Sequence, residues 1–349
     1  MSFTRFSSED IVRQTSKITT STWSNNTNAL TTVFTSSTEA DTTSPTSSGA
    51  HFINVHFDSN VNNPQYAVAY GHRRGSGSLE FTSAVGSKGK SASRNIYSQY
   101  RQLVFGTETQ DFTFTDFTPE DIYVININRS RYKHNLKPGS LNLTLISGSG
   151  GDGVSGEELK LTDDSITSTG SAVITNAGRQ FNIVSGSSGI RLGSSNVQVT
   201  DSGSYGLFYP DSGFIILNPA AVGHTIPNLA PTTTTNTAGD NHKKLLNAIS
   251  GGVGGAAQSS FIIDSEEKIS STFYFARAKN FEFNYTTNPS FTDNSGNVLI
   301  NSMIDNPTSF ITTVGMYNDE GDLLAVAKLS QPVTKDFTKE ALIRVKLDY

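Results

Sequence analysis

The sequence predicts an all-β fold, an antiparallel, β-sandwich-like main domain with an inserted β domain and few short helices. Ser, Thr, Asn and Gly make up about 41% of the 349 residues, a composition typical of turns and of the polar faces of strands. Charged residues account for only 16% of the chain, whereas helix-rich proteins draw heavily on Glu, Lys and Arg. The 21 Phe and 12 Tyr residues supply the apolar surface that a strand-built core needs.

The composition also excludes several classes of protein. The chain has no cysteine, which rules out disulfides, thiolate metal sites and thiol nucleophiles. A net charge of −5 disfavours a nucleic-acid partner, because phosphate binding needs concentrated Lys and Arg. No apolar run reaches the length of a membrane span, and the acidic, polar N-terminus does not resemble a signal peptide. We therefore expect no nucleic-acid partner and no membrane association.

Residues 1–50 are predicted to form an N-terminal arm and linker. They hold 24 Ser and Thr residues, and the stretch 36–50 is polar almost throughout. The apolar residues of the arm are too few to build a core, so the arm is expected to order against the body of the protein or against a neighbouring subunit. They are Phe3, Phe6, Ile11, Val12, Ile18 and Trp23.

Short segments of alternating apolar and polar residues follow the arm, as half-buried strands require. They lie at 51–57, 65–71, 78–85, 110–117, 121–129 and 140–146, and a second series lies at 272–288, 309–318, 322–330 and 341–349. The two series predict a main β domain of residues 51–146 plus 251–349. The segment 92–105 has helical spacing instead, which places Ile96, Tyr100, Leu103 and Val104 near one face.

The last of these segments, 341–349, is predicted to be a paired terminal strand. In its sequence, ALIRVKLDY, the apolar residues Leu342, Val345 and Leu347 are broadly opposed to Arg344 and Lys346 across the two faces of the strand. One face is therefore expected to be buried and the other to meet solvent or a partner.

A change of composition at Ser147 predicts an inserted β domain over 147–250. Gly and Ser dominate from this point, and short strands are expected between turn residues. These strands lie at 158–163, 171–176, 180–186, 196–201 and 213–218. A short helix is expected at 242–249, before a run of glycines.

One formal match to a phosphate-binding loop lies at 84–91, with the sequence AVGSKGKS. In such a loop Lys90 would reach the phosphates and Ser91 would bind Mg²⁺. The motif needs a parallel strand–helix–strand unit, which the surrounding pattern does not provide, so we interpret the segment as a hairpin tip. No other motif singles out a catalytic, cofactor-binding or metal-ligating residue, and we expect a protein that is not an enzyme and holds no cofactor.

Two basic clusters are the candidate interface residues. His72, Arg73 and Arg74 lie in a glycine-rich turn directly after a predicted strand. A second basic cluster follows the strand 121–129 and is formed by Arg129, Arg131 and Lys133. Arginine binds carboxylates through two parallel hydrogen bonds, so each cluster is suited to docking an acidic surface. The alternative for each is a solvated turn or loop.

Four blocks of sequence carry a resemblance to a known family, and together they cover roughly half the chain. The blocks are YAVAYGHR at 66–73 with 96–101, IYVININR at 122–129 with 137–143, YGLFYPD at 205–211 with 215–219, and TVGMYND at 313–319 with 323–330. They resemble virion structural proteins of T4-like, contractile-tailed marine phages of the cyanophage type. The first 50 residues and the loop at 84–91 fall outside these blocks.

The resemblance implies a non-enzymatic structural component of a phage virion. It implies synthesis in the host cytoplasm, a place in the tail baseplate, and other virion proteins as partners, with self-association as a further expectation. A tail fibre or carbohydrate-binding adhesin, and a decoration protein of the capsid or neck, stay open as alternatives.

Overall fold

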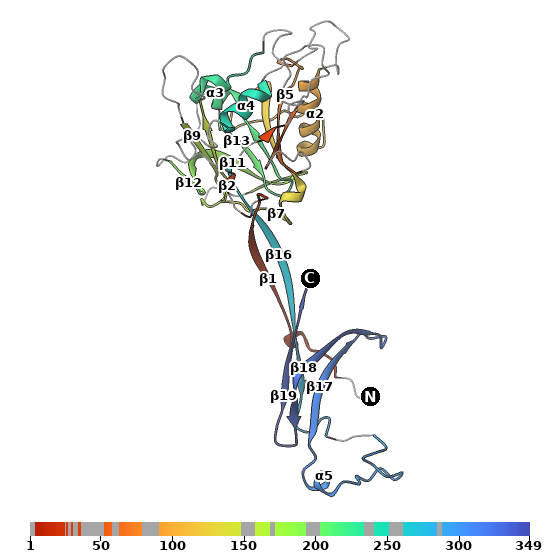
Figure 1. Cartoon of the computed structure of the whole chain (residues 1–349). Coiled ribbons are helices and arrows are strands. Elements are labelled where there is room, and N and C mark those ends of the chain that lie inside the picture. Colours follow the sequence, from red (N-terminus) through yellow and green to blue (C-terminus); the bar gives the residue numbers. More distant parts are fainter. Residues whose placement is uncertain are drawn as a thin grey trace. The chain divides into compact units, whose positions relative to one another are not determined.

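The computed structural model of the chain is mostly β and forms two compact units (Figure 1). It describes residues 4–24, 26, 29–30, 34–35, 52–57, 63–78, 91–147, 158–167, 172–192, 203–233, 241–250, 261–284 and 288–349. Strands hold 47% of the structure and helices 17%, which confirms the predicted antiparallel β class with few helices. Unit 1 consists of Met1–Lys17 and Lys268–Tyr349, and unit 2 of Ile18–Glu267.

Unit 2 is built on one 13-stranded sheet, in which ten strands form a strongly curled half-barrel. The strand order is β2 (Ala29–Leu30), β15 (Phe261–Ile262), β8 (Asn142–Ile146), β9 (Glu158–Asp163), β11 (Gly178–Ser187), β13 (Gly206–Tyr209), β14 (Phe214–Leu217), β6 (Asp121–Ile127), β5 (Pro64–His72), β4 (Phe52–His56) and β3 (Phe34–Thr35). The short strands β10 (Val173–Thr175) and β12 (Ile190–Arg191) both pair with β11.

This sheet takes strands from both of the β domains predicted from the sequence. Strand β8 of the predicted main domain pairs with β9 of the predicted insertion, and β6 pairs with β14 in the same way. The compact units divide near residues 17 and 267, whereas the predicted boundaries lay at 50, 146 and 250. Strand pairing between β8 and β9 therefore continues across Ser147, where the change of composition predicted a domain boundary. The sandwich-like packing of the main domain stays a prediction.

Both faces of the central strand β6 are buried, because its neighbours bring a core to each face. Tyr123, Ile125 and Ile127 belong to the larger core cluster, whereas Ile122 and Val124 belong to the second one, on the opposite face of the strand. Helix α4 (Asn241–Ser250), together with α3 (Pro219–Thr225) and η3 (Pro227–Leu229), contributes to the larger cluster. Helix α2 (Ala92–Phe105) packs on β5 and contributes to the second cluster (Figure 1).

The structure confirms both predicted helices and corrects one helix face. Helix α2 ends at Gly106, whose φ of +71° is the left-handed conformation that favours glycine at a helix end. Leu103 was expected on the buried face, but it is 45% exposed, and Tyr97 is fully buried instead. The alternating segment at 110–117, which was predicted to be a strand, does not form one. Its Phe114 and Phe117 are joined only by an isolated bridge across a tight turn. The predicted strands at 78–85 and 196–201 lie largely outside the described residues.

The N-terminal arm is ordered against its own chain. It contains η1 (Ser8–Asp10) and the long strand β1 (Ile11–Ser21), which lies beside β16 (Asp264–Ala278) in a four-stranded sheet with β19 (Ala341–Asp348) and β7 (Asn135–Leu136). The side chain of Trp23 is buried in unit 2, where its Nε1 donates to the Phe261 carbonyl at 2.9 Å. The polar stretch 36–50 lies outside the described residues.

Unit 1 contains the paired strands β16 and β19, the hairpin of β17 (Ser309–Tyr317) and β18 (Leu323–Lys335), and the short helix α5 (Asn301–Asp305) (Figure 1). The predicted terminal strand is confirmed as β19, but its buried face is formed by Ala341, Ile343 and Val345. Leu342 is 58% exposed because strict alternation places it on the face of Arg344 and Lys346.

Candidate functional site

The first basic cluster lies where β5 ends beside the start of β6. His72 is the cross-strand partner of Asp121, and the Arg73 amide donates to the Glu120 carbonyl at 2.6 Å. The glycine-rich sequence after β5 forms a turn, in which the Gly75 amide donates to the His72 carbonyl at 3.0 Å. Strand pairing therefore fixes the position of these basic side chains.

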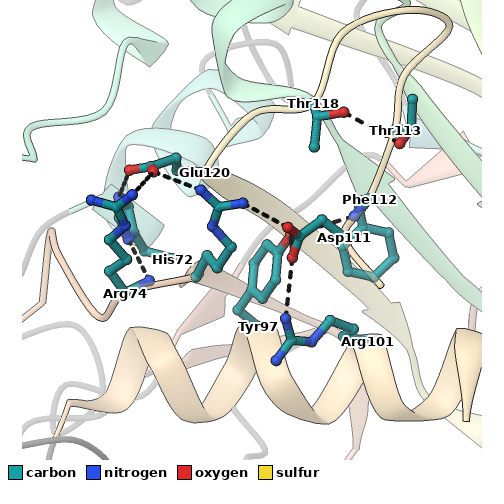
Figure 2. Close-up of polar contacts among 10 residues, drawn as sticks. His72, Arg74, Tyr97, Arg101, Asp111, Phe112, Thr113, Thr118 and Glu120 are labelled. Carbon is teal, nitrogen blue, oxygen red and sulfur yellow. Dashed lines mark hydrogen bonds and ion pairs between the residues drawn. The ribbon is translucent and has the colours of Figure 1, made fainter. Parts of the chain in front are cut away.

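The Arg73 guanidinium bridges two carboxylates from the segment between α2 and β6. Its Nη1 lies 2.6 Å from Asp111 Oδ2 and its Nη2 lies 2.8 Å from Glu120 Oε1. Asp111 also accepts hydrogen bonds from two side chains of α2, from Arg101 Nη1 at 3.1 Å and from the Tyr97 hydroxyl at 3.4 Å (Figure 2). These contacts tie the turn after β5 to α2.

The cluster is largely neutralised within the chain. Arg74 Nη2 lies 3.1 Å from Glu120 Oε1, so three guanidiniums share two carboxylates and leave one net positive charge. The hydrogen bonds that Arg73 donates to Asp111 and Glu120 raise its pKa. The Arg74 side chain is 71% exposed, whereas that of Arg101 is 12% exposed. Of the three, Arg74 is the side chain most available to an external acidic group.

Two titratable groups beside this cluster have shifted pKa values. Burial lowers the pKa of His72, against an opposing effect of Glu120. Its Nδ1 accepts from the Arg74 amide at 3.0 Å, a bond that requires this nitrogen to be unprotonated. Burial raises the pKa of Asp121 to about 6, although the Tyr70 hydroxyl donates to its Oδ2 at 3.1 Å.

The second basic cluster lies at the far end of β6. Arg129 Nη1 donates to the Tyr132 carbonyl at 2.6 Å, and its guanidinium lies 4.6 Å from the centre of the Tyr132 ring. Arg131 Nη1 donates to Ser24 Oγ. The amide of Lys133 donates to Ser265 Oγ at 2.9 Å, while its side chain is exposed. Two of the three basic side chains therefore bond within the chain.

The structure does not bring the two basic clusters together. They flank β6 at opposite ends, and at about 3.3 Å per strand residue they are roughly 20–25 Å apart. The six candidate residues thus form two separate surfaces.

The formal phosphate-loop match falls mostly outside the described residues. Of its residues only Ser91 is described; its Oγ donates to the Gly75 carbonyl at 2.6 Å, and α2 begins directly after it. The strands beside it, β5 and β6, pair antiparallel, so the parallel unit that the motif requires is not formed by them. Within the described ranges no three His, Asp or Glu side chains are grouped as metal ligands would be. The helices there also lack the length and apolar character needed to cross a bilayer.

Sequence reasoning missed the two acidic partners of the first cluster. Asp111 and Glu120 lie 38 and 47 residues from Arg73, and nothing in their local sequence marks them as ion-pair partners. It also missed the exposed apolar side chains of unit 1.

Unit 1 exposes most of its large apolar side chains. Of the 24 large apolar residues that are exposed among those described, 16 lie in unit 1, whereas only five of the 52 buried apolar residues do. Its core consists of Met316, Ile343 and Val345, with partly buried residues around them. A sequence signal existed, because apolar residues occur on both faces of β18, as in the run Leu323, Leu324, Ala325 and Val326.

Comparison with known proteins gives no relative: no family model, no curated protein and no solved structure matches the chain.

Proposed function

We propose that the protein is a non-enzymatic structural component of a phage virion, a tail or baseplate protein that bridges other virion proteins. The observation that carries this proposal is the distribution of apolar side chains in unit 1. Monomeric proteins rarely leave large apolar patches in water, and a patch that is exposed in the single chain marks an interaction surface. The family resemblance of the four sequence blocks supports the same function.

Unit 2 is suited to act as a rigid support in such an assembly. The polar groups of its first basic cluster are paired within the chain, and both faces of β6 are packed. Partners of the proposed type are other virion proteins and copies of the chain itself. Nucleic acid, membrane and cofactor have no place in this function, and the protein would be made in the host cytoplasm and retained in the virion.

The proposal is tested by quantitative mass spectrometry of density-purified particles of the phage that encodes the chain, with detached tails and heads analysed separately. We expect the protein in the tail fraction at a fixed copy number relative to known tail proteins. Its presence only in the head fraction would favour a decoration protein. Its absence from particles, with abundance in the infected-cell lysate, would contradict a structural function.

Glycan binding separates the adhesin alternative from the proposed function. An adhesin binds sugars as an isolated protein, whereas a bridging protein has no such requirement. Specific binding of the purified chain to a glycan array would therefore replace the proposed function with receptor recognition.

A further inference from the structure

Unit 1 contains a buried lysine whose ammonium group has only neutral partners. Lys335, at the end of β18, is 0% exposed. Its Nζ donates to the Asn280 carbonyl at 3.1 Å and to Asn284 Oδ1 at 2.7 Å. Within the described ranges no carboxylate pairs with it, and the adjacent Asp336 pairs with Lys339 instead. A buried charge without a counter-charge is costly, so this ammonium is unfavourable where it lies.

The side-chain amide of Asn284 is held against this lysine. Its Oδ1 accepts from Lys335, and its Nδ2 donates to the Asn280 carbonyl at 2.6 Å, so both ends of the amide are fixed. With a C=O bond of about 1.23 Å, Nζ lies within about 4 Å of the amide carbon, Cγ. Groups react readily when their atoms are held at about 3–3.5 Å, so a small rotation of the amide brings Nζ to that distance.

The turn that carries Asn284 is strained at the preceding residue. Phe283 has a φ of +54°, a left-handed conformation that is rare for a bulky residue. The turn is braced by the Lys279 amide, which donates to Glu282 Oε2 at 2.9 Å. Strained residues that are held by surrounding structure occur mostly at functional positions.

A buried hydroxyl lies on the same face as the lysine. Ser309 is the strand partner of Lys335 in the hairpin of β17 and β18, and opposed residues of an antiparallel pair have Cβ atoms about 4.5–5.5 Å apart. Ser309 Oγ is buried and has no hydrogen-bond partner among the described residues. Since a hydroxyl both donates and accepts, it can carry protons between neighbouring groups.

We propose that Lys335 and Asn284 condense to an isopeptide bond, a covalent cross-link within unit 1. A desolvated lysine amine is a nucleophile, and here Nζ attacks Asn284 Cγ. The Nζ–Cγ bond forms and the Cγ–Nδ2 bond breaks. Two protons pass from Nζ to Nδ2, which leaves as an ammonium ion, so the condensation consumes no further reactant. The proton that stays on Nζ keeps its bond to the Asn280 carbonyl, and the buried charge is removed.

The bond would support a unit that has little core of its own. It closes a ring from Asn284 to Lys335 and ties to β18 the turn that carries the exposed Phe281. A cross-link around a long loop restricts the unfolded chain. The buried core cluster of unit 1 contains only Met316, Ile343 and Val345, and the chain has no cysteine for a disulfide. The inference goes beyond the proposed function and does not depend on it.

Peptide mass spectrometry of the purified natural chain tests the bond. Trypsin cuts after a free lysine but not after one whose Nζ is part of an amide. We therefore expect no cut after Lys335, and peptide 329–339 joined to peptide 280–328 with the loss of one ammonia. Separate peptides with a cut after Lys335 would overturn the inference. Loss of ammonia from an unjoined peptide 280–328 would also overturn it, because that product is a cyclised asparagine.

Two variants and a matched control locate the bond. Asn284→Ala and Lys335→Arg each remove one reacting group, so the joined peptide should be lost and trypsin should cut after position 335. The control Asn280→Ala changes an exposed side chain but keeps the backbone carbonyl that accepts from Lys335, so it should retain the joined peptide. A joined peptide that persists in Asn284→Ala would contradict the inference. The natural chain gives the deciding result even where a variant fails to fold, and neither result bears on the presence of the protein in particles.

Discussion

Arg73 and Asp111 form the shortest ion pair of the first basic cluster, with Nη1 and Oδ2 2.6 Å apart. The pair joins the turn after β5 to the segment after α2, and Asp111 also receives Arg101 from the helix. A sequence pattern that suggested an external docking site is therefore engaged mainly within the chain.

Replacing Asp111 by Asn should destabilise unit 2. The substitution removes the charge that compensates Arg73 and the nearly buried Arg101, and the expected cost is about 1–3 kcal/mol. Urea unfolding followed by fluorescence measures it, because the only tryptophan of the chain, Trp23, is buried in unit 2. The control Glu108→Gln makes the same change of charge at an exposed position nearby and should have little effect. Equal urea midpoints for the two variants would show that the Arg73–Asp111 pair contributes nothing to the stability of unit 2.

Replacing Asp121 by Asn should alter the pH dependence of stability. The pKa of Asp121 is raised from 3.8 to about 6 in the folded chain, so its protonated form favours folding. This stabilisation is complete below about pH 4 and is lost as the pH rises through about 6, with an amplitude of about 2–3 kcal/mol. Asn cannot ionise and still accepts the Tyr70 hydroxyl, so the variant should gain stability relative to the natural chain as the pH rises from 4.5 to 7.5.

The lowered pKa of His72 acts in the opposite direction, because the fold then disfavours the protonated form and loses stability as the pH falls below about 6.5. Both the natural chain and Asp121→Asn contain His72, so this effect cancels when their free energies of unfolding are subtracted at each pH. The control Asp116→Asn changes an exposed carboxyl. A difference between the Asp121 variant and the natural chain that is constant across this pH range would refute the assignment.

The sequence predicted local elements well and long-range pairing poorly. Alternation located β4, β5, β6, β8, β9, β14, β17, β18 and β19, and helical spacing located α2, because these periodicities are local properties. The partner of a strand is set by contacts across the whole sheet, which is why the pairing of β8 with β9 crossed a predicted domain boundary. The candidate site shows the same limit. The basic residues were visible in the sequence, but Asp111 and Glu120, which decide what those residues do, were not.

Replacing Lys335 by Met should loosen the turn at 279–284. The substitution removes the buried donor to Asn280 and Asn284 while keeping a side chain of similar length. Amide hydrogen exchange should become at least tenfold faster in this turn. Lys328→Met, at an exposed position of the same strand, should leave the exchange unchanged. Unchanged exchange in the Lys335 variant would show that the lysine does not hold the turn.

Two neighbouring residues of β19 should respond differently to the same substitution. Ile343→Ala opens space in the small core of unit 1 and should cost about 2–4 kcal/mol. Leu342→Ala changes an exposed side chain and should stay within about 0.5 kcal/mol. Calorimetry of the full chain measures both. A larger loss for Leu342 would mean that this face is also covered in solution.

A cryo-EM map of the purified phage particle tests the central claim, that this chain is a virion structural protein whose unit 1 surface is covered by assembly. We predict that the chain fits density in the tail or baseplate, with the side chains of Phe281 and Phe310 in contact with a neighbouring subunit. A complete map without density for this chain, or one in which unit 1 is present and both side chains face solvent, would contradict the account.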